Sequence, residues 1–436
     1  MALFVQKYGG TSVGSIERIQ RVADRIIHTI QQGHRVVVVV SAMAGETNRL
    51  TELALQITDT PSAREHDVLV TAGEQVSIAL LSIALISRGY SAVSMLADQA
   101  GIKAAGHFGN ARIESINTQV IEEHLQHNRI VIVAGFQGRD IEQNLISLGR
   151  GGTDTTAVAV AAALEADECQ IFTDVDGVYT TDPRLVKCAQ KLSEVTFEEM
   201  FELASCGAKV LHRRSVELAG KYHVPLRVLS SFSPTNSDIQ QSGTLITSSV
   251  TRHTELDQRV SKQKVAMENK KITGITASEN ETMIAFDLPA VPQTEVFDLL
   301  SVLTEQDIEL DMLSHEASFT HESTVAAIRF VIKTKDLPTA LSLLQQYTEK
   351  NKLFSGQVMQ VSDSVAKISV VGVGMRSHAG VITAVLKRLA RQQIPVLLAS
   401  ATEIKVSVII DKRYMELAVN ALHEEFALNA EQSIKL

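Results

Sequence analysis

The sequence predicts an α/β protein in two parts: a three-layer αβα domain built on a mainly parallel sheet, followed by two small βαββαβ modules. Three observations predict this class. Short runs rich in Val and Ile alternate with helical-period segments over residues 1–247. Residues 36–40 are all valine, which is typical of a strand buried on both faces. The order strand, helix, strand, strand, helix, strand then recurs after residue 271.

In the first part, we predict strands at residues 3–5, 35–40, 91–96, 129–136, 145–148 and 169–173. Helices are expected between them, because Ile16, Ile19, Val22, Ile26 and Ile30 recur at helical spacing. Glycine and polar clusters follow several of these strands. Ligands of open α/β sheets gather at the carboxyl ends of the strands, so we expect the functional site there.

Residues 248–271 are polar and weakly periodic, which predicts a linker. Beyond it we predict strands at residues 272–277, 282–288, 308–313, 324–332, 357–361, 366–371, 395–400 and 405–410, and helices at 295–304, 338–349, 380–393 and 415–426. The second module lacks a closing strand, whereas residues 272–277 are left over at the front. We therefore expect one module at 279–364, inserted into another that comprises 272–278 plus 365–436, after a first domain at 1–247.

Composition narrows the classes of function. The chain has 436 residues, of which 45% are hydrophobic, enough for two or three folded domains. A net charge of −9 disfavours a nucleic-acid or anionic-membrane surface. The three cysteines form no C-x-x-C motif, and neither a signal-like amino terminus nor a long uninterrupted apolar run is present. We expect reduced thiols, no metal-ligating set of side chains and a cytoplasmic location.

The first candidate motif is the loop Lys7-Tyr8-Gly9-Gly10-Thr11-Ser12, which follows the first strand. Glycines let backbone N–H groups approach phosphate oxygens, a following helix directs its positive end at them, and the lysine adds a full charge. A plain strand-to-helix turn is the alternative. A Walker loop is excluded, because Ser15 stands where its lysine is required.

Residues 149–156, GRGGTDTT, repeat this logic, and Arg150 offers a planar fork suited to a carboxylate. The alternative is a capped helix start with Thr153 or Asp154 as N-cap. Residues 173–184 form a third polar segment at a strand end, either an ordinary turn or a nucleotide cover. Together with Ser41 and Glu74, these loops predict one active site.

The segments KYGGTSVGS, VVVVVSAMAGETNRL, GEQVS, GRGGTDTTA, FTDVDGVYTTDPR and GAKVLHRRSVELA resemble the aspartate kinases of the amino acid kinase family, and the likeness runs through the whole chain. The resemblance implies a kinase domain followed by paired ACT modules, the βαββαβ amino-acid sensors. It also implies transfer of the γ-phosphoryl of Mg-ATP to the side chain of L-aspartate, as the first step of lysine, threonine and methionine (diaminopimelate) biosynthesis, with Mg²⁺ carried by ATP.

The same resemblance assigns roles residue by residue. Lys7 and Asp154 would be catalytic. The positions implied for ATP are Lys7, Tyr8, Gly9, Gly10, Ser41, Thr173, Asp174, Tyr179, Asp182, Arg184 and Lys209. The positions implied for aspartate are Thr47, Glu74, Phe136, Arg150, Gly151, Gly152 and Thr153. For Glu74 an ion-paired helix residue, and for Lys209 a solvated lysine, are the alternatives.

The chain departs from the family pattern at three places. Thr153 stands where serine is usual, residues 288–293 lack the usual Pro-Gly turn, and Pro395 replaces a frequent effector-binding asparagine. Lysine or threonine feedback is therefore open. Gly372-Val373-Gly374 imitates a dinucleotide fingerprint, but Ser377 occupies its third glycine position, which disfavours a dehydrogenase. Rival functions are a glutamate-type amino acid kinase and a non-catalytic amino-acid sensor. We expect at least a homodimer, because ACT sheets generally pair across subunits.

Overall fold

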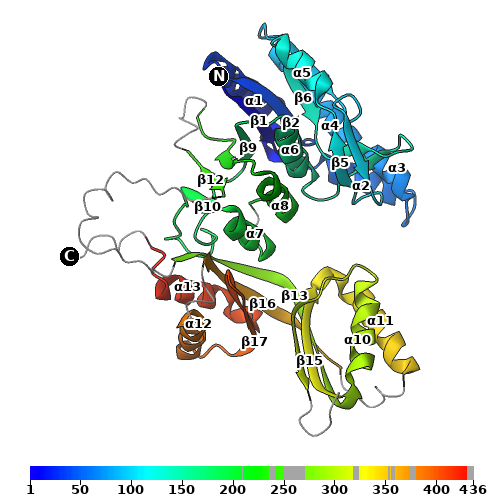
Figure 1. Cartoon of the computed structure of the whole chain (residues 1–436), viewed down its shortest axis with the longest axis vertical. Coiled ribbons are helices and arrows are strands. Elements are labelled where there is room, and N and C mark those ends of the chain that lie inside the picture. The colour runs from blue at the N-terminus through cyan, green and yellow to red at the C-terminus, as the bar shows by residue number, and fades with distance from the viewer. Residues whose placement is uncertain are drawn as a thin grey trace, which may run out of the picture. The chain divides into compact units, whose positions relative to one another are not determined.

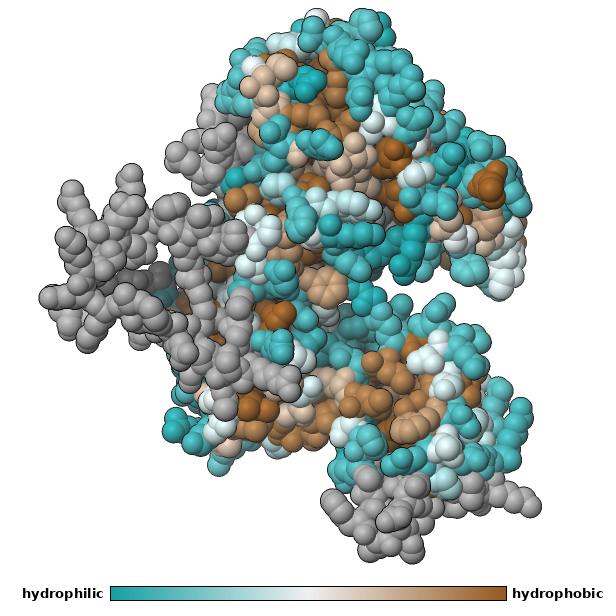
Figure 2. Space-filling view, viewed as in Figure 1, coloured by the Kyte–Doolittle hydropathy of each residue, from teal (hydrophilic) through white to brown (hydrophobic). Residues whose placement is uncertain are grey.

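The computed structural model describes residues 1–208, 210–234, 242–248, 271–317, 324–351, 354, 359–373 and 380–429. The chain divides into two compact units. The first comprises Met1–Tyr179 and Lys191–Ala266, and the second comprises Thr180–Gln190 and Met267–Leu436. Hydrophilic residues cover much of the face shown in Figure 2, with apolar patches between them.

An eight-stranded sheet forms the centre of the first unit, in the order β10-β12-β11-β9-β1-β2-β6-β3. Neighbouring strands are parallel except β11 and β12. Their bounds are β1 Leu3–Tyr8, β2 Arg35–Val40, β3 Ala92–Met95, β6 Ile130–Ala134, β9 Glu168–Thr173, β10 Glu194–Thr196, β11 Leu226–Ser230 and β12 Thr244–Thr247. The predicted mainly parallel sheet is confirmed.

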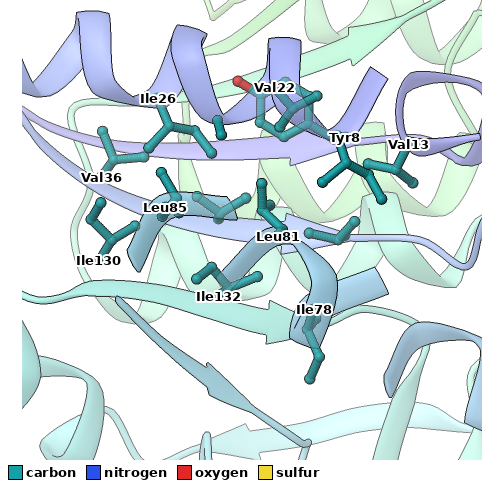
Figure 3. Close-up of a cluster of buried hydrophobic side chains, with 14 of the residues drawn as sticks. Tyr8, Val13, Val22, Ile26, Val36, Ile78, Leu81, Leu85, Ile130 and Ile132 are labelled. Carbon is teal, nitrogen blue, oxygen red and sulfur yellow. The ribbon is translucent and has the colours of Figure 1, made fainter. Parts of the chain in front are cut away.

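Helices cover both faces of this sheet. On one face, α1 (Ile16–Gln31) and α4 (Ala72–Ile86) pack on Val36, Val38 and Val40, as Figure 3 shows for part of the cluster. The alternate valines, Val37 and Val39, are equally buried. They point to the opposite face, where α6 (Gly152–Ala163) contacts β1, β2 and β9. Burial on both faces explains why an unbroken valine run forms β2, an interior strand of the sheet.

The first unit also contains a second sheet, which was not predicted as a sheet. It has the order β5-β4-β7-β8, with β4 Ile102–Ala105, β5 Arg112–Ile116, β7 Gln137–Arg139 and β8 Leu145–Ser147. Of these strands only β8 was predicted, at residues 145–148. Further helices are α2 (Glu46–Leu55), α3 (Ala63–Val70), α5 (Gln119–Gln126), α7 (Phe197–Ser205) and α8 (Arg213–Tyr222). These strands are too short for a clear two-residue period.

The second unit contains a six-stranded sheet in the order β14-β15-β13-β16-β18-β17. The strands are β13 Lys271–Pro292, β14 Asp311–Ala317, β15 Thr324–Lys333, β16 Met359–Val373, β17 Val396–Ala401 and β18 Lys405–Asp411. Two of them, β13 and β16, run through both halves of the sheet, so each joins two predicted strands into one (Figure 1). Within β13, Ile275 lies opposite Val370 and Ala277 opposite Ile368, so the early strand pairs with the later module as expected.

Two helices pack on each half of this sheet. α10 (Gln293–Thr304) and α11 (Leu337–Lys350) bury one cluster, and α12 (Gly380–Arg391) and α13 (Met415–Glu425) bury another. Residues 288–292, expected as a loop, continue β13 as far as Pro292, where α10 begins. The segment Thr180–Gln190 also belongs to this unit, because Val186 lies in the second cluster and the carbonyl of Thr180 accepts a hydrogen bond from the N–H of Ile275 at 2.7 Å. The predicted domain bounds otherwise stay a prediction.

Among the described residues, one helical stretch, Ala63–Ile86, has the length and hydropathy of a membrane span. Half of its most apolar window is buried inside the fold. Within this stretch, Ile78, Leu81 and Leu85 of α4 pack into the core against α1 and the sheet (Figure 3). The stretch is accounted for as a core helix.

Candidate active site

An ion pair joins the first and second candidate loops. Lys7 is the penultimate residue of β1, and Asp154 lies in the first turn of α6. The Lys7 Nζ and Asp154 Oδ1 atoms are 2.6 Å apart, and the two side chains are only 11% and 14% exposed. The ion pair therefore brings the Lys7 loop against the first turn of α6, which directly follows the turn that contains Arg150.

The glycine loop after β1 packs tightly against the end of β2. A Cβ on Gly10 would lie 2.9 Å from the carbonyl oxygen of Ala42, so only glycine fits without a shift. The N–H of Ala44 donates to the carbonyl of Gly10 at 3.1 Å, and the N–H of Ser41 donates to the carbonyl of Tyr8 at 3.1 Å. These contacts bring Ser41 beside the predicted phosphate loop.

Glu74 is a buried carboxyl at the start of α4, and it is 3% exposed. Its Oε1 accepts a hydrogen bond from the N–H of Ala42 at 3.0 Å, while its buried Oε2 has no partner among the described residues. Burial raises the pKa of Glu74 to about 7, and the Ala42 hydrogen bond opposes that shift. An ammonium group would satisfy the free oxygen and favour the ionised form.

The turn around Arg150 depends on glycine. Gly149 and Gly151 have φ values of 71° and 75°, and a Cβ on Gly151 would overlap the ring of His212. Thr153 packs against Gly135, where a Cβ would overlap its methyl group. Arg150 is exposed and forms no ion pair with any other residue that the structure describes. Its guanidinium is thus available for an external carboxylate.

Phe136 adjoins this turn on the other side. It has a φ of 91°, and its ring lies where a Cβ on Gly152 would come within 2.8 Å. The N–H of Phe136 donates to the hydroxyl of Thr156 at 3.4 Å. The predicted aspartate-side positions in residues 136 and 150–153 therefore form one packed group.

The helix α6 begins earlier than expected. It starts at Gly152, with Gly151 as its N-cap in the left-handed region, so neither Thr153 nor Asp154 caps it. The alternative interpretation of this segment as a side-chain-capped helix start is therefore wrong. Gly151 takes the positive φ, and Thr153 and Asp154 are left in the first turn.

Two residues near this turn were missed at the level of sequence. His212 directly precedes α8, and its ring packs on Gly151. Burial lowers the pKa of His212, while the nearby charge of Asp154 acts in the opposite direction. The Nδ1 atom of His212 has no hydrogen-bond partner among the described residues. Arg214 donates to the carbonyls of Leu148 at 2.7 Å and Ala111 at 2.9 Å. Both residues lie in the segment GAKVLHRRSVELA. The polar run HRRS, directly after the apolar pair VL, was the feature of the sequence that could have indicated functional residues here.

The predicted nucleotide positions divide between the two units. In the first unit, Thr173 ends β9, and its hydroxyl donates to Asp174 at 3.1 Å. Tyr179 donates to Asp176 at 2.9 Å. Asp182 and Arg184 are paired at 2.6 Å in the second unit. Lys209 lies outside the described residues.

Thr47 lies on the aspartate side of the prediction. It occupies the first turn of α2, and its carbonyl accepts a hydrogen bond from the hydroxyl of Thr51 at 2.9 Å. This bond involves the backbone of Thr47 and leaves the role of its hydroxyl open. The expected contact of that hydroxyl with substrate therefore stays a prediction.

The described residues contain no cluster of three or more side chains that could hold a metal ion. Mg²⁺ prefers oxygen ligands and is commonly held by one or two carboxylates plus substrate phosphates. Here the carboxylate of Asp154 lies next to the phosphate-suited loop that contains Lys7. This donor set fits a metal that arrives with a nucleotide.

Comparisons with known proteins agree with this architecture. A model of the amino acid kinase family matches residues 2–230, and an ACT domain model matches residues 368–426. The aspartate kinase of Stutzerimonas stutzeri is 48% identical over 433 residues, which cover 99% of this chain and 98% of that protein. The crystal structure of an aspartate kinase from Synechocystis aligns with a TM-score of 0.78 at 29% identity and covers both chains completely.

A more distant solved structure shares the fold. Aspartokinase III of E. coli, in complex with aspartate and ADP, aligns with a TM-score of 0.76 at 24% identity over 97% of this chain and 99% of that one. The likeness again extends over both units of the chain.

Proposed function

The chain belongs to the amino acid kinase family and is an aspartate kinase, and we propose that it transfers the γ-phosphoryl group of Mg-ATP to the side-chain carboxylate of L-aspartate. The product is 4-phospho-L-aspartate. The observation that carries the proposal is the 2.6 Å ion pair between Lys7 and Asp154, which places a cation of one glycine loop at the start of the helix that follows the other.

The amino-acid end of the proposed site matches both charges of the substrate. Arg150, exposed at the turn, is proposed to hold the α-carboxylate bidentately. Glu74, whose buried Oε2 has no partner among the described residues, is proposed to accept the ammonium group. Thr47 and Thr153 would add hydroxyl contacts, with Phe136 and the glycines of the turn forming the wall.

Transfer of a phosphoryl group between two anions depends on positioning and charge stabilisation. Lys7, the N–H groups of Gly9 and Gly10, and the hydroxyl of Ser41 are proposed to stabilise the transferring group. Asp154 holds the ammonium of Lys7 at 2.6 Å and so fixes its direction. Mg²⁺, bound with ATP, would neutralise phosphate charge. The substrate carboxylate attacks directly, and no side chain forms a covalent intermediate.

The remaining nucleotide contacts are proposed for residues at the ends of β1 and β9 and in the segment after β9. These are Tyr8, Thr173, Asp174, Tyr179, Asp182 and Arg184, and we add Lys209, which lies outside the described residues. Because Asp182 and Arg184 belong to the second unit, their part in nucleotide binding needs a separate test.

A coupled assay of ADP release, with aspartate and glutamate offered separately, tests the substrate. Turnover that depends on aspartate supports the proposal. Glutamate-dependent turnover alone would favour the glutamate-type kinase. A non-catalytic sensor would show no amino-acid-dependent turnover, and the presence of both Lys7 and Asp154 in contact argues against it.

We further propose that amino acids regulate the enzyme through its ACT modules. The segment Thr180–Gln190 supports this, because the chain runs directly from the predicted nucleotide residue Tyr179 into the second unit and returns at Lys191. Within that unit, the hydroxyl of Thr180 lies 3.0 Å from Nε2 of His423 on α13, and Asn420 donates to the carbonyl of Leu185 at 3.4 Å. A displacement of α13 would be transmitted along the chain to Tyr179.

The effector is to be found by titrating activity with lysine, threonine and diaminopimelate, singly and in pairs. We propose that this reaction is the first step of lysine, threonine and methionine biosynthesis. Inhibition by one of these compounds would support that assignment, because the end product of a pathway commonly inhibits its first enzyme. The ACT modules depart from the family pattern at Pro395 and in the glycine-free segment 288–293, so the identity of the effector is open. Lack of any response would contradict the regulatory part of the proposal alone.

We also propose a cytoplasmic homodimer or higher homo-oligomer. The six-stranded sheet ends in β14 and β17, and in the described part of the chain neither has a hydrogen-bonded strand on its outer edge. Pairing with a second copy would satisfy these edges. Sedimentation velocity tests this, and a monomer at micromolar concentration would contradict it.

A further inference from the structure

Asp67 is a buried carboxylate on α3 that no step of the proposed reaction uses. It is 1% exposed. Its Oδ2 accepts hydrogen bonds from the N–H of Ser147 at 2.7 Å and of Gly109 at 2.9 Å, and its Oδ1 accepts one from the hydroxyl of Ser147 at 2.7 Å. It forms no ion pair with any described residue. Burying a carboxylate is costly, so these three bonds make it a specific cross-link.

The two segments that Asp67 joins lead to the arginine-bearing turn. Ser147 is the last residue of β8 and stands two residues before Gly149. A Cβ on Gly149 would lie 2.7 Å from the carbonyl oxygen of Gly109, so the two segments touch at that point. The N–H of Ala111 also donates to the carbonyl of Ser147 at 2.9 Å.

Arg214 ties the same two segments from α8. It donates to Leu148, the neighbour of Ser147, and to Ala111, which is close to Gly109. Two charged side chains from different helices thus hold adjacent residues of one strand end against one neighbouring loop. Neither is at a position predicted to contact substrate.

We propose that Asp67 is a positioning residue, which fixes the backbone of residues 147–152 so that Arg150 and Thr153 meet the amino-acid substrate. The proposal rests on the aspartate kinase activity proposed above and deepens it. A guanidinium on an exposed side chain binds a carboxylate well only when its backbone is held in place, because a misplacement of about 1 Å can cost roughly 100-fold in rate. The geometry, and not the charge, of Asp67 is what matters.

Asp67→Ala removes all three hydrogen bonds, whereas Asp67→Asn can keep them. An asparagine oxygen in the place of Oδ2 accepts from both N–H groups, and its amide can donate to the hydroxyl of Ser147. We expect Asp67→Ala to raise KM for aspartate about tenfold or more, with KM for Mg-ATP within about twofold of wild type. Asp67→Asn should stay within about threefold of wild type for both.

A matched control is Glu168→Gln, at the amino end of β9, which removes the charge from a partly buried carboxylate that pairs with Arg227 at 2.9 Å. It should lower the unfolding temperature without raising KM for aspartate selectively. If Asp67→Ala raised KM for aspartate and KM for Mg-ATP equally, or raised neither, the positioning role would be overturned. The proposed function would still stand as long as the wild-type enzyme is active on aspartate. If Asp67→Ala does not fold, Asp67→Ser decides, because its shorter side chain keeps a polar group but cannot accept from both N–H groups and the Ser147 hydroxyl as the carboxylate does. An unchanged KM for aspartate in Asp67→Ser would overturn the role.

Amide hydrogen exchange separates this inference from the proposed function. Peptides that cover residues 107–111 and 145–152 should exchange their amide hydrogens faster in Asp67→Ala than in wild type. In Glu168→Gln their exchange rates should equal those of wild type. Unaltered exchange in both variants would contradict the cross-link even if the wild-type enzyme proved inactive on aspartate. Absence of aspartate-dependent turnover in the wild type, with the expected exchange, would refute the function and leave the cross-link standing.

Discussion

Lys7 and Asp154 form a 2.6 Å ion pair that links the end of β1 to the first turn of α6. Both side chains are largely buried, so each compensates the desolvation of the other. Loss of one partner leaves the other as an unpaired buried charge, which is costlier than loss of the pair. The pair is therefore a structural as well as a functional element.

Lys7→Ala should lower kcat about 100-fold or more, because it removes the cation proposed to stabilise the transferring phosphoryl group. Its unfolding temperature should also fall, since Asp154 is left unpaired. The double variant Lys7→Ala with Asp154→Ala should recover part of that stability but no activity. Lys103→Ala, at an exposed position of β4, is the control. Wild-type turnover in Lys7→Ala would rule out the proposed role.

Glu74 predicts a pH dependence of substrate binding. Its pKa is raised to about 7, so the carboxyl is largely protonated at pH 6 and ionised at pH 8. Only the ionised form attracts the ammonium of aspartate, so KM for aspartate should fall as pH rises through about 7. Glu74→Gln should raise KM and remove this slope. A slope that persists unchanged in Glu74→Gln would assign it to another group.

The fold was predicted closely because its strands carry clear signals. Residues 35–40 are apolar after Arg35, and β2 has those bounds. In the second unit, the predicted helix at residues 415–426 corresponds to α13, Met415–Glu425. What sequence did not show is that β13 and β16 run on through both halves, because a strand's continuation depends on pairing partners that are distant in the chain.

The site was predictable only in part. The glycine loops stand beside strands, so their convergence follows from the parallel sheet. His212, Arg214 and Asp67 were missed, because each acts on a backbone segment far from it in sequence. The sequence also did not show that Thr180–Gln190 belongs to the second unit. Val186 is a single apolar residue in a polar loop, and only the structure shows that it packs into the core under α12 and α13.

His423 predicts how stability varies with pH. Burial lowers its pKa below the ordinary value of 6.5, so the folded state favours the neutral ring. The unfolded chain then binds more protons as pH falls through about 6.5, and the free energy of unfolding falls with it. The contribution of Glu74 to stability changes with pH in the opposite direction. Because the pKa of Glu74 is raised in the folded state, the free energy of unfolding falls as pH rises from about 4.5 to 7.

Urea unfolding of wild type and His423→Gln at pH 5.5, 6.5 and 7.5 isolates the His423 contribution as a difference. The stability gap between them should narrow toward low pH. Gln126→Ala, an exchange of side chains that do not titrate at an exposed position, is the control and should show a constant gap. A gap for His423→Gln that widened as pH fell would contradict a lowered pKa for His423 in the folded state.

Two neighbouring glycines of the first loop give a sharper test of its packing. A Cβ on Gly10 would lie 2.9 Å from the backbone oxygen of Ala42, whereas a Cβ on Gly9 would lie 3.3 Å from the ammonium of Lys7, a contact that a small shift of the side chain relieves. Gly10→Ala must therefore displace the loop from Ala42, whose N–H also binds Glu74. We expect it to lower kcat/KM for Mg-ATP about 100-fold and raise KM for aspartate as well. Gly9→Ala should cost less than about tenfold, because a side chain yields more readily than backbone. Steady-state kinetics of the two variants, with circular dichroism to confirm folding, would contradict this account if Gly9→Ala were the more damaging.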